Sequence, residues 1–305
     1  MWRSGQADTV AELFNAIDDI LTSVGWLRYD YSTTKKVYSG TGRGTDKIYL
    51  QIWYTQKTDP TDDEPDRIYV DGPAGFDRNL SWYEQPGGLM QQLKVEECDA
   101  KKFTVPIPAI ITTPNERFFY WLFCDTYRLI VVTRHSTVYE SSYIGFINPI
   151  ASERQYPYPM YLCGNGRSNG PAWNSNYSGA FVFPDAYSGW LRLIDGVWRD
   201  FAASADTPSP TTRGTVFPYT AHNKKLIPNY KEEDAINQDN FLLIPIILQT
   251  NDPIMMCGYL RGCYWISGTR DIDTERILVF DGVQYIVFDT KSRRSPNSYF
   301  AIALR

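Results

Sequence analysis

Three closely spaced apolar runs between residues 116 and 164 limit most strongly what this chain can fold into. Short polar breaks separate the runs, which are Phe118–Cys124, Arg128–Thr133 and Val138–Ile147. Each run is rich in β-branched and aromatic residues and too short for a helix to be the default structure. In the first run, large apolar side chains fill both sets of alternating positions: Phe119, Trp121 and Phe123 on one, Phe118, Tyr120 and Leu122 on the other. The pattern predicts an antiparallel meander covered on both faces.

One amphipathic helix is predicted near the N-terminus, over residues 9–24. Its apolar side chains recur at helical spacing: Val10, Leu13, Phe14, Ile17, Ile20, Leu21 and Val24. Thr9 and Glu12 have the spacing of a capping box, and Gly25 stands where the helix would end. We expect the apolar stripe to pack on the strands that follow it.

The remaining patterns predict short strands, so the expected fold class is mainly β (α+β). We expect antiparallel sheets with a β-sandwich-like core and the single N-terminal helix packed on strands. The clearest hairpin spans residues 276–288, with Asp281-Gly282 as its turn. Prolines at 106, 108 and 114 predict a domain boundary. They divide the chain into an α+β domain over 1–105 and a larger all-β domain with long loops over 106–305.

Charge and composition argue against several classes of protein. The net charge of −5 disfavours a nucleic-acid partner, which requires clustered Lys and Arg. The sequence has no run of about 18 apolar residues, so no membrane span is predicted. The first residues have no apolar region of the kind found in secretory signal peptides. The five cysteines are few and odd in number, which favours reduced, buried thiols over disulfides.

The sequence motifs that could indicate a catalytic site fit a structural role better. Gly166-Arg167-Ser168-Asn169-Gly170 matches a hydrolase nucleophile pattern, with Asp195 and His222 following in the hydrolase order. The helix that this motif needs does not follow, because residues 171–176 begin with proline and are polar. His135 fits a hydrogen-bonded structural imidazole better than a catalytic base.

Metal and cofactor sites are not predicted either. Two histidines and no paired cysteines argue against zinc. The acidic clusters at 62–66 and 271–275 are typical of solvated turns. The second spaces its carboxylates as some calcium loops do but lacks the glycine of an EF-hand loop. We therefore assign no catalytic, cofactor-binding or metal-ligating residue, and we expect a protein that is not an enzyme.

Aromatic residues are abundant, with 22 Tyr and 9 Trp, as in proteins that work through surface contact. We predict contact surfaces at loops 155–178 and 202–215. The candidate interface residues are Tyr156, Tyr158, Trp173, Tyr177 and Trp190. The aromatics Trp173, Tyr177, Trp190 and Trp198 could instead stack on sugars, although packing is their commoner role.

Three segments spread along the chain carry a family resemblance. They are the opening from Gly25-Trp26 to Asp46–Leu50, the centre formed by Tyr139–Phe146 and Gln155–Pro159, and the end formed by Leu260–Gly268 and Asp281–Tyr285. They resemble structural proteins of the tail and baseplate region of tailed bacteriophages.

The resemblance implies a non-enzymatic virion component without cofactor, made in the host cytoplasm and assembled with other tail and baseplate proteins. It leaves open whether the place is the baseplate, the neck or the surface of the tail tube. Because such assemblies usually close into rings, we expect a cyclic homo-oligomer. Two alternatives remain: a receptor-binding tail protein that holds a glycan, and a glycan-cleaving enzyme with paired carboxylates.

Overall fold

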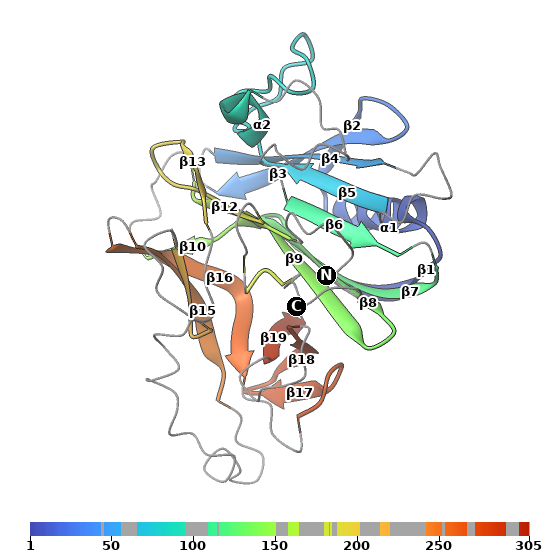
Figure 1. Cartoon of the computed structure of the whole chain (residues 1–305), viewed down its shortest axis with the longest axis vertical. Helices are drawn as coiled ribbons and strands as arrows, with labels where there is room; N and C mark the ends of the chain where they lie inside the picture. Colours follow the sequence, from blue (N-terminus) through green and yellow to red (C-terminus); the bar gives the residue numbers. More distant parts are fainter. Residues whose placement is uncertain are drawn as a thin grey trace.

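The chain is mainly β, with three antiparallel sheets and two helices among the residues that its computed structural model describes (Figure 1). These residues are 1–43, 46–55, 66–94, 109–114, 116–150, 158–164, 180–182, 184, 188–201, 214–219, 242–251, 254–266, 272–290 and 299–304. The predicted fold class is therefore confirmed.

The central sheet contains the predicted meander. Its strand order is β1-β7-β8-β9-β11-β12-β13. The strands are β1 (Trp2–Ala7), β7 (Phe118–Cys124), β8 (Arg128–His135), β9 (Val138–Phe146), β11 (Met160–Cys163), β12 (Gly189–Arg192) and β13 (Trp198–Asp200). Consecutive strands β7, β8 and β9 pair antiparallel, with Trp121 opposite Val132 and Val131 opposite Ser142.

The N-terminal sheet has the sequential order β2-β3-β4-β5-β6. Its strands are β2 (Leu27–Asp30), β3 (Lys35–Arg43), β4 (Asp46–Thr55), β5 (Asp66–Asp71) and β6 (Ala109–Thr113). The short helix α2 (Leu89–Leu93) belongs to the segment after β5. Trp82 and Met90 of this segment pack on Trp53 and Tyr69, so the segment covers the outer face of the sheet.

The C-terminal sheet has the order β14-β15-β16-β19-β18-β17, and β10 pairs with β16 off this path. Its strands are β14 (Gly214–Phe217), β15 (Ile244–Asn251), β16 (Ile254–Ile266), β17 (Ile277–Phe280), β18 (Val283–Asp289), β19 (Tyr299–Leu304) and β10 (Asn148–Pro149). Strands β17 and β18 form the hairpin predicted at 276–288, and its turn residues Asp281 and Gly282 both have positive φ, as a two-residue turn requires.

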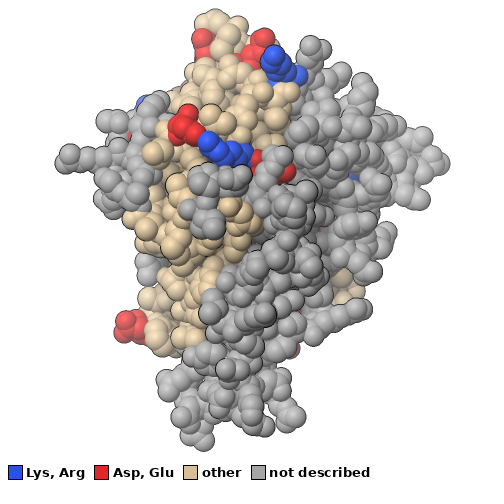
Figure 2. Space-filling view, turned by 60° about the vertical axis from the view of Figure 1, so that its left-hand side comes forward, with Lys and Arg blue, Asp and Glu red and all other residues tan. Residues whose placement is uncertain are grey.

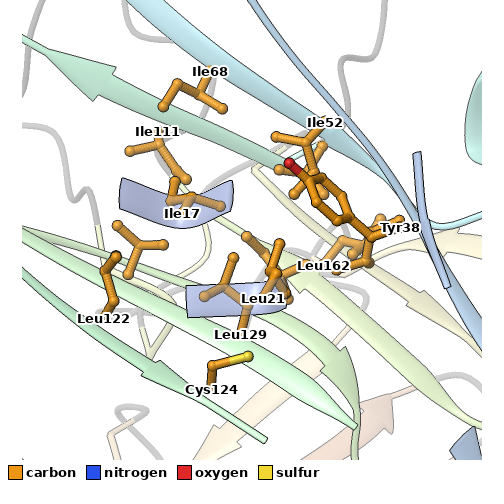
Figure 3. Packing of buried hydrophobic residues seen from close by; sticks show 14 of the residues in the cluster. Ile17, Leu21, Tyr38, Ile52, Ile68, Ile111, Leu122, Cys124, Leu129 and Leu162 are labelled. Atoms are coloured by element: carbon orange, nitrogen blue, oxygen red, sulfur yellow. The ribbon is translucent and has the colours of Figure 1, made fainter. Parts of the chain in front are cut away.

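Helix α1 (Val10–Ser23) lies between the N-terminal and central sheets (Figure 3). Figure 3 shows Ile17 and Leu21 pointing into a layer bounded by Ile52 on one side and Leu129 on the other. The predicted N-cap at Thr9 is confirmed, because its hydroxyl accepts a bond from the Glu12 N–H at 3.2 Å. The Glu12 carboxylate accepts the N–H of Asp8 at 2.7 Å rather than that of Thr9, so the capping box is only half formed. Gly25 has φ +98° after the last turn, as predicted for the helix end.

Apolar cores cover both faces of the central sheet, as predicted. Leu129 and Val131 of β8 pack with α1 and the N-terminal sheet. Ile130 and Val132, on the opposite face, pack with the C-terminal sheet. Successive residues of a strand point to opposite faces, so a strand that is apolar throughout is stable only when both faces are covered.

Strand pairing does not follow the domain boundary predicted at residues 105 and 106. Strand β1, from the first predicted domain, pairs with β7 of the second. Strand β6, from the second, completes the N-terminal sheet beside β5. The prediction grouped strands by position in the sequence, whereas hydrogen bonding joins β1 to a strand more than a hundred residues away and joins β6 to β5 across the predicted boundary.

Candidate functional site

The predicted interface residues that the structure describes are buried. Tyr158 is 1% exposed and Trp190 is 4% exposed, and both belong to the core between the N-terminal and central sheets. The interface prediction does not hold for these two, because each belongs to a segment that the sheets enclose. Trp198 is also buried, at 2%, so it cannot stack on a sugar. Tyr156, Trp173 and Tyr177 lie outside the described residues.

Tyr158 instead helps to join two sheets. Its ring packs on Phe146 of β9, with centroids 5.0 Å apart. Its hydroxyl accepts a bond from Arg43 Nη1 at 3.1 Å, and its N–H donates to the Asp46 carboxylate. Burial raises the pKa of Asp46 despite that bond. The Tyr158 contacts are those of a structural residue.

A second polar cluster surrounds Asp71, whose side chain is fully buried after β5. Its carboxylate accepts bonds from the N–H groups of Gly72, Leu89 and Met90 at 2.7, 2.9 and 3.2 Å. Burial raises the pKa of Asp71, although these bonds and the charge of Arg192 oppose the change. The carboxylate thereby fixes the segment carrying α2 to the end of β5, which is a structural role.

A third cluster lies where the three sheets meet, at the turn between β7 and β8. Asp125 Oδ2 accepts a bond from Arg128 Nε at 3.3 Å and forms an ion pair with Arg261 Nε at 3.3 Å, and the Asp125 carbonyl oxygen accepts the indole N–H of Trp26 at 2.9 Å. The Arg261 guanidinium lies 4.5 Å from the centre of the Tyr127 ring. Because these groups come from the central sheet, from β16 of the C-terminal sheet and from Trp26 between α1 and β2, the cluster holds these parts of the fold together.

Of the histidines and acidic residues considered from the sequence, His135, Glu275 and Asp195 form pairs with other side chains, whereas His222 and residues 62–65 and 271 lie outside the described residues. His135 Nε2 lies 2.7 Å from Glu116 Oε1, at the edge of β8. Glu275 bonds Arg134 and the Tyr139 hydroxyl. In the hydrolase-like pattern, Asp195 bonds Arg199, and the other members lie outside the described residues. Among described residues, no three His, Cys, Asp or Glu side chains form a group that could hold a metal.

The four described cysteines are buried free thiols, as predicted for them; Cys98 lies outside the described residues. Burial raises the pKa of Cys163 to about 12 and that of Cys263 to about 11. A thiol with so high a pKa is a poor nucleophile at neutral pH. These cysteines therefore serve packing.

Of the fifteen large apolar side chains that are exposed among the described residues, seven lie on the C-terminal sheet or directly after its strand β10. They are Ile150 (53% exposed), Met255 (41%), Met256 (53%), Tyr259 (40%), Ile277 (48%), Val279 (63%) and Phe280 (46%). Figure 2 turns the side bearing β10, β15 and β16 toward the reader, and its described atoms carry few charges.

Strand β16 forms a hairpin with β15, and we call the exposed part of β16 the hairpin patch. It is defined by Met256 and Tyr259. Met256 pairs with Gln249 and Tyr259 with Ile247, so both share one face of the sheet. That face is opposite to Leu248, which is fully buried against the central sheet. The hairpin patch therefore points away from the core. Sequence analysis missed it; the adjacent pair Met255-Met256 in a strand was the available signal.

Comparison with models of known protein families and with curated protein sequences found no match to this chain. Among the described residues, no helix has the length and apolar character needed to cross a membrane.

Proposed function

We propose that this protein is a non-enzymatic structural subunit of a bacteriophage tail, at the baseplate, the neck or the tail tube, and that it acts through protein–protein contacts. The observation that carries the contact role is the hairpin patch. Met256 and Tyr259 are 53% and 40% exposed on a strand face that turns away from the core. Exposed methionine and tyrosine are enriched in protein interfaces relative to the rest of the surface.

The polar groups support this proposal by their arrangement. The clusters at Asp71, Asp125 and Glu275 each bond groups from separate elements of the fold. Such networks rigidify a scaffold, which suits a subunit that must keep its shape under load. The placement in a phage tail rests on the three sequence segments that resemble tail and baseplate proteins.

The test uses purified tailed particles of a phage that encodes this chain. We expect mass spectrometry to find this chain in the particles, and antibody labelling to place it at the tail end or neck by electron microscopy. Labelling at fibre tips would favour the receptor-binding alternative. Absence of the chain from the particles would overturn the virion role.

The hairpin patch is tested by a double substitution, Met256→Lys with Tyr259→Lys. Because charge in the desolvated centre of an interface is unfavourable, we expect incorporation into particles to fall by roughly tenfold or more. Leu27→Lys is the matched control, since Leu27 is also exposed, at 61%, but lies on β2 of the N-terminal sheet. Equal incorporation of the double variant and the control would remove the patch from the contact surface.

A further inference from the structure

Strand β17 forms one edge of the C-terminal sheet, and no described strand pairs with its outer side. Its four residues, Ile277, Leu278, Val279 and Phe280, carry no charge. Leu278 is buried, at 4% exposed, whereas Ile277, Val279 and Phe280 are 48%, 63% and 46% exposed. This edge therefore presents a wholly apolar strand to solvent.

The other sheet edges among the described residues are charged or covered. Strand β1 exposes Arg3, β2 exposes Arg28 and Asp30, and β13 carries Arg199 and Asp200. Strand β14 is half buried, and the described side chains of β6 are buried. Charge and cover are the devices that prevent edge strands from pairing with another chain. Strand β17 has neither device.

The turn of the β17–β18 hairpin establishes which backbone groups point outward. Asp281 and Gly282, with φ of 48° and 71°, form a two-residue turn closed by the pair Phe280 and Val283. In such a hairpin the closing pair exchanges its backbone hydrogen bonds, and bonded pairs then alternate along the strands.

The alternation leaves the peptide groups of Ile277 and Val279 directed away from β18. The Val287 N–H donates to the Arg276 carbonyl at 3.0 Å, as expected if the even-numbered residues bond inward. Two residues with outward N–H and C=O groups, two positions apart, are the minimum that a neighbouring antiparallel strand needs.

We propose that β17 pairs antiparallel with β17 of a second copy of this chain, so that the C-terminal sheets of two molecules join across a two-fold axis. Ile277 of each copy lies opposite Val279 of the other, and these bonded pairs use the outward groups. Leu278 lies at the axis, opposite its own copy. The contact is isologous and closes after two subunits.

The symmetry of β17 favours a second copy as the occupant. Its two residues with outward backbone groups, Ile277 and Val279, flank Leu278, so a second copy supplies matching N–H and C=O groups in the same register. Asp281 of one copy then faces Glu275 of the other, whose carboxylate is already bonded by Arg134 and Tyr139. The strand is thus self-complementary in hydrogen bonding and shape. The inference does not depend on a place in the virion.

The dimer is expected to be weak, because four residues from each copy give an interface at the small end of the known size classes. Sedimentation of the full chain over a range of about 1–500 µM covers the dissociation constants expected of such interfaces. We expect the apparent mass to rise from monomer to dimer across that range, and amide exchange in residues 274–282 to slow in parallel.

Two substitutions test the geometry. Val279→Pro removes an outward N–H without removing a bond to β18, a position where edge strands tolerate proline. Val279→Lys adds the charge with which natural edges avoid pairing, and we expect either variant to weaken dimerisation by roughly tenfold or more. Leu27→Lys is the matched control and should dimerise as the parent chain does.

Circular dichroism of each variant establishes that it folds. If Val279→Pro does not fold, the dimerisation of Val279→Lys tests whether the β17 edge forms the contact. A parent chain that stays monomeric throughout the range would overturn the proposal, and so would Val279→Lys dimerising as the parent does. Dimerisation of a chain that is absent from particles would refute the virion role alone.

Discussion

Asp18 shows at the scale of one residue how a buried charge is held in this fold. It lies on α1 and is 6% exposed. One carboxylate oxygen accepts bonds from Arg28 Nη1 at 2.8 Å and Lys36 Nζ at 2.5 Å, and the other accepts the Tyr38 hydroxyl at 2.9 Å. Burial by itself raises the pKa of Asp18, but Lys36, Tyr38 and Arg28 together outweigh it and lower the pKa.

We expect Asp18→Asn to lower the free energy of unfolding by about 1–3 kcal/mol at neutral pH, because three donors lose a charged acceptor. A carboxyl with a lowered pKa stabilises the fold above its unfolded pKa, and that contribution is lost as the pH falls through its folded pKa. The difference in free energy of unfolding between the parent chain and Asp18→Asn should therefore shrink below about pH 3.9, the ordinary carboxyl pKa. Urea unfolding of both proteins at several pH values measures this difference.

Asp19→Asn is the control for this prediction. Asp19 is exposed, with its carboxylate 3.8 Å from Arg3, and exposed pairs contribute little. Equal effects of the two substitutions at neutral pH would show that the Asp18 bonds do not stabilise the fold.

At the scale of the element, α1 is stable because two sheets cover it. An isolated helix of 14 residues is marginal in water, so packing must supply most of its stability. Leu13, Ile17, Ile20 and Leu21 are fully buried between the N-terminal and central sheets. The helix therefore acts as part of the core that holds those two layers together.

Ile17→Ala should reduce the free energy of unfolding by about 2–5 kcal/mol, because it removes buried methyl groups and leaves a cavity between two sheets. Asn15→Ala, on the exposed side of the same helix, should change it by less than about 0.5 kcal/mol. Urea unfolding of both variants makes the comparison. A small loss for Ile17→Ala would mean that the sheets close around the helix more loosely than the burial indicates.

At the scale of the whole molecule, the three sheets form a stack whose middle layer is completed by the chain's first strand. Strand β1 pairs along its whole length with β7, from Trp2 opposite Phe123 to Ala7 opposite Phe118. Helix α1 follows directly and covers one face of the same sheet. Residues 1–23 thus complete a sheet whose other strands all come from beyond residue 117.

A fragment of residues 106–305 tests whether the second half folds alone. It lacks β1 and α1, so one face and one edge of the central sheet would be uncovered, and we expect it to lose cooperative unfolding and near-ultraviolet circular dichroism. The full chain is the control. Cooperative unfolding of the fragment would support the domain division predicted from the prolines.

The sequence by itself determined those features that depend on neighbouring residues. Helix α1 and its caps follow from 3.6-residue spacing and from Thr9, Glu12 and Gly25. The β7–β9 meander follows from short apolar runs, and the β17–β18 hairpin from its Asp281-Gly282 turn. In each case the decisive interactions lie within one element or between consecutive ones.

Only the tertiary structure decided which strands pair at long range and which aromatic residues are exposed. Burial depends on what packs against a segment, so Tyr158 and Trp190, predicted at an interface, lie in the core, while Met256 and Tyr259 lie on the surface. The pairing of β1 with β7 likewise joins residues more than a hundred positions apart. Local patterns state that a strand is apolar, but the layers around it decide whether another part of the chain or a second molecule covers it.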